Sequence, residues 1–140
     1  MADCKRWSVD VHYFTLQPDE IDKHWGWIEP LLLKIEDVVW TPLEVKEALI
    51  AAEAQLWAFG EEPRGIVVTR LGKIGQTPTG VVWLAAGESI DNFTHFLRVY
   101  IEPWFRLNGC KLVELNGRKG WAKFLPDYRL MPQVTLAKEL

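Results

Sequence analysis

Two β-rich segments followed at once by a long helical pattern constrain the fold of this chain most. Gly65 to Leu71 and Gly80 to Ala86 are short, largely apolar runs, and the glycine- and proline-containing stretch Gly72 to Thr79 predicts a hairpin loop between them. Apolar residues then recur at helical spacing from Ser89 to Leu107, where Pro103 predicts a kink or a split. This order predicts a sheet with helices packed against it.

The segment from Thr41 to Phe59 has the strongest local helix signal. Thr41 is a good N-cap, Pro42 can occupy the first helical position, and Glu44 completes a capping box. Apolar residues then recur at helical spacing as far as Phe59, and Gly60 follows as a stop. We therefore expect a single helix over this segment.

The other expected elements are shorter and alternate in type. Their boundaries follow from proline positions, turn residues and runs of apolar residues. We expect strands at Ser8 to Thr15, Cys110 to Leu115 and Gln133 to Ala137, and a short helix from Lys119 to Leu125. We also expect a helix that starts at Pro18 and ends or kinks at Glu29-Pro30, with Leu31 to Ile35 continuing as a short helical or turn segment. Together these elements predict one α+β domain over residues 1–140.

The bulk properties argue against several classes of function. The net charge of −3 provides no basic field that would concentrate the protein on nucleic acid. No apolar run approaches the ~20 residues that a membrane span needs, and the first ten residues lack the pattern of a signal peptide. Cys4 and Cys110 are too few for a disulfide framework. We therefore expect a cytoplasmic protein.

The order of the expected elements resembles the GNAT acyltransferase fold, a mixed sheet whose fourth strand leads into a long helix. The resemblance places the fourth strand at Val81 to Ala86, the long helix at Ser89 to Leu107, the fifth strand at Cys110 to Leu115 and the fourth helix at Lys119 to Leu125. It allows for a short or missing strand at the hairpin. It implies a single GNAT-like domain, a mixed central sheet flanked by helices.

The resemblance also implies where an acyl-CoA would bind. Family members commonly carry a Gln/Arg-x-x-Gly-x-Gly/Ala loop after the fourth strand, whose N–H groups hold the pyrophosphate. Here the segment from Ala85 to Asp91 has a single glycine and no Gln or Arg, and its acids Glu88 and Asp91 oppose a pyrophosphate. If an acyl-CoA binds, the implied cofactor-binding residues are Leu84, Ala86, Gly87, Ser89 and Asn116.

A second family feature is an asparagine after the fifth strand, followed by a helix that often presents a tyrosine as general acid. Asn116 matches the asparagine, but the tyrosine position falls near Leu125. Tyr128 follows just beyond Pro126 and could substitute only if the chain folds back. Catalytic residues therefore stay unassigned.

Other candidate residues have plain alternatives. The three histidines show no ligand spacing, which predicts no metal site: they are His12, His24 and His95. Three acids could act as a general base but also suit a solvated helix surface: Glu53, Glu88 and Asp91. A small basic cluster could meet a phosphate or an acidic partner, or simply face solvent: Arg118, Lys119 and Lys123.

A narrower resemblance is to small GNAT-like proteins of tailed bacteriophages. The tryptophan-rich chain, the altered coenzyme loop and the segment from Asn116 to Leu125 carry it. It implies that the fold serves as a packing or assembly module. Eight tryptophans are also more than a core of this size easily hides, so we expect some of them to form an exposed contact surface.

Three hypotheses for function follow. The first is a non-catalytic GNAT-like structural or binding protein of phage origin, without a cofactor, that contacts other protein subunits, including virion components. It would lie in the cytoplasm of the producing cell or in the virion. The alternative is an N-acyltransferase that uses acetyl-CoA or another acyl-CoA, with the strand edge from Leu84 to Ala86 holding the pantetheine. The third is a GNAT-like module that binds a small metabolite without chemistry.

Overall fold

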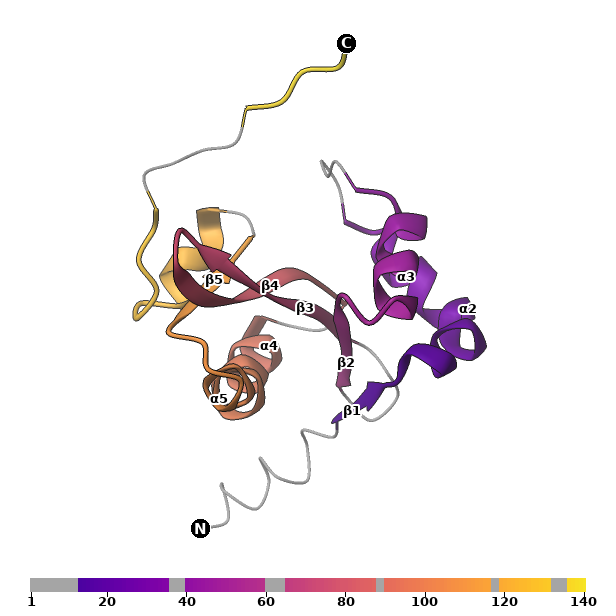
Figure 1. The fold of residues 1–140 in the computed structure, drawn as a ribbon, viewed down its shortest axis with the longest axis horizontal. Helices are drawn as coiled ribbons and strands as arrows, with labels where there is room; N and C mark the ends of the chain where they lie inside the picture. Colours follow the sequence, from indigo (N-terminus) through magenta and orange to yellow (C-terminus); the bar gives the residue numbers. More distant parts are fainter. Residues whose placement is uncertain (1–12, 36–39, 60–64, 88–89, 117–118, 132–135) are drawn as a thin grey trace.

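A five-stranded sheet forms the centre of the molecule (Figure 1). The structure, a computed structural model, describes residues 13–35, 40–59, 65–87, 90–116, 119–131 and 136–140. The strands lie in chain order, and all neighbours are antiparallel except the parallel pair β4 and β5. They are β1 Tyr13–Leu16, β2 Gln55–Phe59, β3 Gly65–Ile74, β4 Thr77–Gly87 and β5 Leu112–Leu115. The sheet is therefore mixed, as expected.

Helices pack on both faces of this sheet (Figure 1). On one face, called the α2/α3 face, a buried cluster includes Ile28, Leu49 and Leu56. On the other, called the α5 face, a second cluster includes Phe96 and Phe105. The helices are η1 Pro18–Glu20, α2 Ile21–Leu32, α3 Pro42–Ile50, α4 Ile90–Phe96, the π-helical segment η2 Leu97–Ile101, α5 Glu102–Leu107 and the 3-10 helix η3 Lys119–Phe124.

The single helix expected from Thr41 to Phe59 is wrong in its second half. The cap is confirmed, since Thr41 Oγ1 accepts from the Glu44 N–H at 3.2 Å, but α3 ends at Ile50. The chain then forms β2, which is buried on both faces because its side chains alternate between the two clusters. A strand buried on both faces is a continuous apolar run, and periodicity does not distinguish such a run from a buried helix.

A left-handed alanine ends α3. Ala52 has φ of 61°, its N–H donates to Leu49 O at 3.2 Å, and the next N–H, of Glu53, donates to Ala48 O at 2.9 Å. These two bonds form a Schellman motif, in which glycine normally occupies the left-handed position. The stop signal was therefore not readable from residue type, because alanine is a strong helix former.

We expect Ala52→Gly to stabilise the protein by about 0.5–1 kcal/mol, because glycine adopts positive φ without the steric cost that a Cβ adds. Urea unfolding would measure the change. Ala51→Gly is the matched control: Ala51 has φ of −79°, so the same substitution there only adds flexibility to the unfolded chain and should destabilise. Equal effects at both positions would contradict this account of the helix end.

The hairpin before the long helix is confirmed, with a tighter turn than expected. β3 and β4 continue through most of the predicted loop as far as the pair Ile74 and Thr77, so that Gly75, with φ of 60°, and Gln76 alone form the turn. The expected fourth strand lies within β4. The strand that was thought to be short or missing at the hairpin is β2, earlier in the chain.

The predicted break at Pro103 is confirmed as a change of helix type. The helical stretch passes through the π-helical segment η2, whose closing bond runs from the Glu102 N–H to Leu97 O, and α5 then starts with Pro103 in its first turn. The wider π turn removes the need for a regular bond at the proline, which has no N–H. Pro30, in contrast, does not stop α2, since the Leu33 N–H donates to Glu29 O at 3.0 Å and closes the last turn.

The ends of the chain are only partly comparable with expectation. β1 begins at Tyr13, and the earlier part of the expected strand lies outside the described residues. Ser89, the expected start of the long helix, also lies outside them. β5 and η3 lie inside the segments predicted for them. Of the expected last strand, Leu136 and Ala137 are described and form no strand, in a segment that extends away from the body (Figure 1).

Candidate ligand site at the edge of β4

β4 carries a bulge at Trp83. Val68 on β3 pairs with Leu84, and the next residue, Thr69, pairs with Val82, so Trp83 is an extra residue on β4. As a result, Trp83 and Leu84 both pack on the α2/α3 face, whereas Val82 packs on the α5 face. The bulge changes which side chains of β4 face each helix layer.

β5 stops pairing with β4 at this bulge. The parallel register ends with Val82 opposite Leu115, after which the Asn116 N–H donates to Val82 O at 3.2 Å. In the described part of the chain, no strand pairs with this edge of β4 beyond Val82. Backbone groups between Trp83 and Gly87 that point away from β3 therefore lack a ladder partner, although they lie next to the centre of the sheet. An extended ligand with amide groups could pair with them.

The candidate cofactor-binding residues lie along this edge and beside it. Leu84 is 4% exposed and Ala86 is partly buried, so their side chains belong to the α2/α3 core and only their backbone can meet a ligand. Gly87 has φ of 100° and pairs with Gly65 at the end of β4. Asn116 is exposed directly after β5. Ser89 lies outside the described residues.

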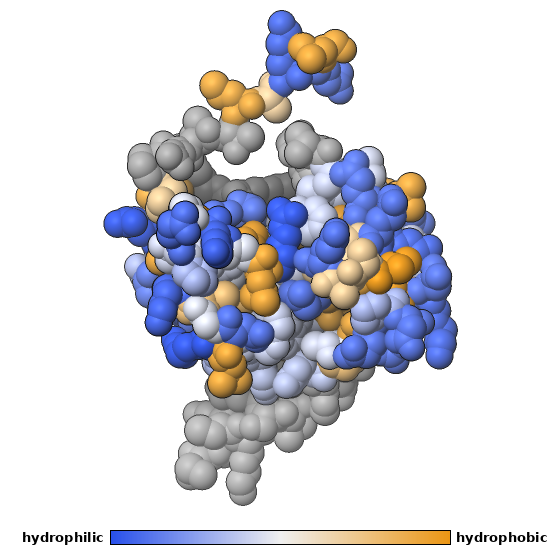
Figure 2. Space-filling model, in the orientation of Figure 1, coloured by the Kyte–Doolittle hydropathy of each residue, from blue (hydrophilic) through white to orange (hydrophobic). Residues whose placement is uncertain are grey.

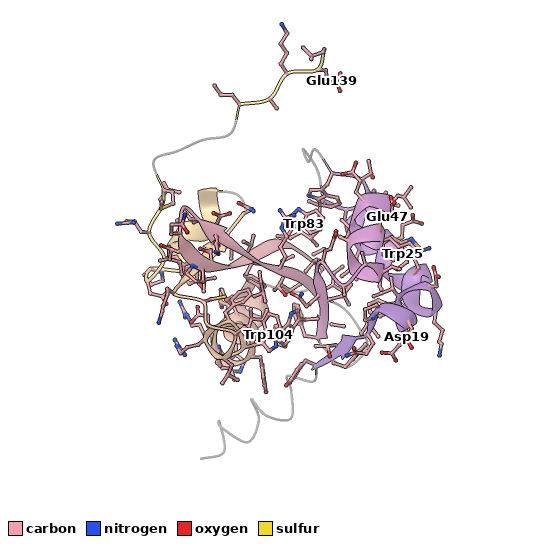
Figure 3. All side chains as sticks on the ribbon, viewed as in Figure 1. Asp19, Trp25, Glu47, Trp83, Trp104 and Glu139 are labelled. Atoms are coloured by element: carbon pink, nitrogen blue, oxygen red, sulfur yellow. The ribbon has the colours of Figure 1, made fainter. Side chains whose placement is uncertain are left out.

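Sequence reasoning missed an aromatic and cationic cluster that lies beside the same edge. The Arg70 guanidinium lies 4.2 Å from the ring centroid of Trp83, and Trp40 meets Trp83 edge-on at 6.5 Å. Figure 3 shows Trp83 on the side of the sheet where α3 lies. Strand alternation could have placed Arg70 and Trp83 on the same face, but the hairpin register that sets the two side by side was not predicted.

Glu114 adds a carboxylate to this face. Its neighbours on β5, Val113 and Leu115, both pack on the α5 face, so Glu114 points to the opposite side. It lies opposite Val81, which in turn lies opposite Arg70. Three adjacent strands thus carry a row of a cation, an apolar residue and an anion across the α2/α3 face.

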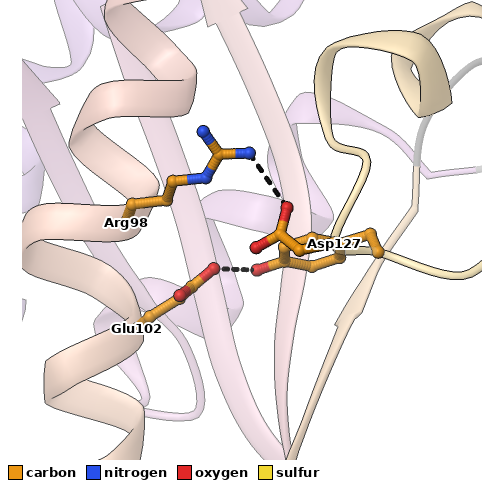
Figure 4. Close-up of polar contacts among 4 residues, drawn as sticks. Arg98, Glu102 and Asp127 are labelled. Atoms are coloured by element: carbon orange, nitrogen blue, oxygen red, sulfur yellow. Dashed lines mark hydrogen bonds and ion pairs between the residues drawn. The ribbon is translucent and has the colours of Figure 1, made fainter.

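Two side-chain bridges join α5 and η2 to the segment after η3 (Figure 4). The Tyr128 hydroxyl donates to Glu102 Oε2, and Arg98 Nη2 lies 2.9 Å from Asp127 Oδ1. Burial, the hydrogen bond to Glu102 and the nearby carboxylates raise the pKa of Tyr128 above its usual range. The hydroxyl is thus held protonated and is already bonded. Leu125, near which the family tyrosine would fall, is 2% exposed in the core.

The raised pKa of Tyr128 predicts a pH dependence of stability. The folded chain binds this proton more tightly than the unfolded chain, so its contribution is complete below pH about 10 and is lost as pH rises. Above that pH we expect the free energy of unfolding to fall more steeply in the wild type than in Tyr128→Phe, by up to about 1.4 kcal/mol per pH unit. Urea unfolding at a series of alkaline pH values measures both slopes. Equal slopes would exclude the raised pKa.

The six tryptophans whose side chains are described do not form the exposed group that we expected. Figure 2 shows the apolar side chains of the visible face as small separate groups among polar ones. Trp57 is 4% exposed, and five others are partly buried against one of the two clusters: Trp25, Trp27, Trp40, Trp83 and Trp104. Trp7 and the side chain of Trp121 lie outside the described residues. These six side chains belong to the two buried clusters and do not support the expected tryptophan contact surface.

The remaining candidates add little chemistry. His24 Nδ1 accepts from the Trp27 indole N–H at 3.0 Å, and no group of three or more possible metal ligands occurs among the residues described. Of the three candidate acids, Glu53 is exposed, and the structure does not describe Glu88 or the side chain of Asp91. In the basic cluster, Arg118 and the side chain of Lys119 are likewise not described. Lys123 is exposed beside the Phe124 ring. Within the described ranges, no helix is long and apolar enough to cross a membrane.

The fold is shared with solved acetyltransferase structures. No protein-family profile matches the chain, and no curated protein is a significant match to its sequence. The protein TTHA1254 from Thermus thermophilus is 20% identical, with 92% of this chain and 97% of that chain covered at a TM-score of 0.58. A ribosomal-protein-alanine N-acetyltransferase from Brucella melitensis biovar Abortus 2308 is 11% identical, with 93% and 99% covered at 0.60. A GCN5-related N-acetyltransferase from Ralstonia eutropha JMP134 is 12% identical, with 93% and 98% covered at 0.63. The chain therefore has the GNAT-like α+β fold that its element order predicted.

Proposed function

We propose that this protein is an N-acyltransferase that takes its acyl group from a pantetheine thioester such as an acyl-CoA. The edge of β4 between Trp83 and Gly87 carries the proposal: it is bulged, it lies next to the centre of the sheet, and no described strand pairs with it. Backbone groups without a strand partner at such a position are available to pair with an extended ligand. The coverage of whole acetyltransferase chains by this fold supports the same function.

The proposed roles follow from the two sides of this edge. The backbone from Leu84 to Gly87 would bond the amides of the pantetheine, much as it would bond another strand. An amine from the α2/α3 face would attack the thioester carbonyl carbon, so that a C–N bond forms and the C–S bond breaks. The amine proton would pass to a base, for which Glu114 is a carboxylate on that face of the described sheet, and the leaving thiolate would take up a proton.

The acids that follow Gly87 bear on the choice of donor. Glu88 and Asp91 stand where the family's loop would hold a pyrophosphate, and their charge opposes one. A donor that lacks the diphosphate, such as acetyl-pantetheine, avoids this repulsion. We therefore expect the protein to lose less affinity when the nucleotide diphosphate is removed than an enzyme with the glycine-rich loop would.

Calorimetry with acetyl-CoA, free CoA and acetyl-pantetheine tests the proposal. Saturable binding of one of the thioesters, followed by thiol release when an amine is added, is the expected result. Glu114→Gln should lower the rate of thiol release while leaving thioester binding unchanged, and Glu53→Gln, an exposed acid after α3, is the matched control. Failure of all three compounds to bind would exclude the acyltransferase.

A non-catalytic GNAT-like binding or structural protein remains the second candidate. The Tyr128 hydroxyl favours it, because the tyrosine closest to the family's general-acid position is bonded to Glu102. Under this hypothesis the partners are other protein subunits, including virion components, and the phage origin depends mostly on the segment from Asn116 to Leu125. Absence of thioester binding, together with a stable complex of defined stoichiometry with a virion subunit, would establish this reading.

A further inference from the structure

Arg70 is an exposed cation with no recorded hydrogen bond or ion pair to the described residues. It is exposed, and no carboxylate pairs with it among the residues that the structure describes; its one recorded contact is the stack on the Trp83 ring. Lys46, the other cation that stacks on a tryptophan in this layer, is in contrast paired with Asp22 at 2.8 Å. A stacked guanidinium keeps its edge N–H groups free in a fixed plane, which suits a planar oxyanion.

Trp83 places this guanidinium next to the candidate ligand site. It is the first residue of β4 past the last partner on β5, and its ring packs on the α2/α3 face. Trp40 contacts the ring edge-on. Neither Arg70 nor this pair of rings is needed to hold the acyl donor, which the proposed function places along the backbone of Leu84 to Gly87. The cluster is therefore free to contact the acceptor.

We infer that Arg70, held on Trp83, binds an oxyanion of the acceptor, either a carboxylate or a phosphate. Glu114 lies two strands away in the same row, and with a strand spacing of about 4.8 Å the two Cα atoms are about 10 Å apart. Both side chains can reach toward Val81 between them, so a small molecule with an amine and an oxyanion fits the row. The inference rests on the proposed function and names its substrate class as an anionic amine.

The test compares amines that differ only in the anion. Common amino acids are matched with their carboxamides, and phosphoethanolamine is matched with ethanolamine. Each is titrated against the donor-free protein, with tryptophan fluorescence and calorimetry as readouts, and is then assayed for thiol release with the donor that binds. We expect the anionic member of a pair to bind more tightly, on the order of tenfold or more.

Variants of Arg70 assign the effect. Arg70→Gln should abolish the preference for the anionic member, and Arg70→Lys should restore only part of it because lysine lacks the planar fork. Lys73→Gln is the matched control: it removes the same charge from an exposed position on β3 that points to the other face of the sheet. Thermal unfolding checks that all three variants remain folded, as expected for exposed side chains.

Each outcome decides one of the two claims. Equal binding of the anionic and neutral members, no binding of either, or a preference that survives Arg70→Gln overturns the inference. An Arg70-dependent preference without any thioester binding keeps the inference and removes the acyltransferase. Thiol release that is indifferent to the anion keeps the acyltransferase and removes the inference. A stronger response to phosphoethanolamine identifies phosphate, and one to an amino acid identifies carboxylate.

Discussion

Phe96→Ala should destabilise the protein by about 3–5 kcal/mol, a large share of the stability of a domain of this size. Phe96 is fully buried, and its ring contacts four other aromatic rings on two strands and the helix: Tyr13, Trp57, Phe59 and Tyr100. Its removal leaves a cavity that these rigid rings cannot fill. Urea unfolding followed by tryptophan fluorescence would measure the loss.

Phe124→Ala is the matched control for this prediction. The same side chain is removed, but Phe124 is 41% exposed, so the expected loss is under about 1 kcal/mol. If Phe96→Ala does not fold, Phe96→Leu keeps the test open, since it removes less volume and should cost less. A Phe96→Ala protein as stable as Phe124→Ala would show that the aromatic cluster does not hold β1 and β2 to α4 and η2.

Gly80→Ala should cost about 1–3 kcal/mol through overpacking. Gly80 lies on β4 beneath Phe105, and a Cβ built at Gly80 would lie 2.3 Å from that ring, far inside the contact distance. Phe105 is 1% exposed in the α5-face core, so the ring or the strand must shift to accept the added methyl group. The change is measured by urea unfolding. Gly72→Ala, on the neighbouring strand with nothing within 4 Å of the added Cβ, should be neutral or stabilising.

A double variant separates overpacking from a change in strand propensity. When Phe105 is first reduced to leucine, Gly80→Ala should cost clearly less than in the wild type, because the added methyl group then has room. An unchanged cost in the Phe105→Leu background would show that the penalty does not come from the ring. This glycine is therefore expected to be a packing residue rather than part of the site.

Much of the fold could be predicted from local signals. The cap at Thr41, the hairpin and the interruption at Pro103 each depend on residues whose conformational preferences are strong, and each is confirmed. β2 could not be predicted, since burial of Trp57 on one face and Leu56 on the other depends on both helix layers being in place. Tertiary packing decided its conformation, and a left-handed alanine hid the end of the helix before it.

The site was predictable only as a stretch of strand. The resemblance led to Leu84, Ala86 and Gly87, which do lie along the unpaired edge, but their side chains face the core or are absent. The side chains that can contact a ligand, Arg70 and Trp83, lie on different strands. Their contact depends on the register of the hairpin, which sets the two strands side by side and which the predicted loop from Gly72 to Thr79 did not define.

The bulge makes Trp83 an addition to β4 rather than a part of its regular ladder. Deleting Trp83 would restore a regular ladder with β3 and would leave Leu84 and Ala86 in one core and Val82 in the other, because Val82 and Leu84 already lie on opposite faces. The deletion should therefore keep the fold while it removes the ring on which Arg70 stacks. A library of single-residue deletions along β3 and β4, selected for folding, would show whether this position tolerates the loss.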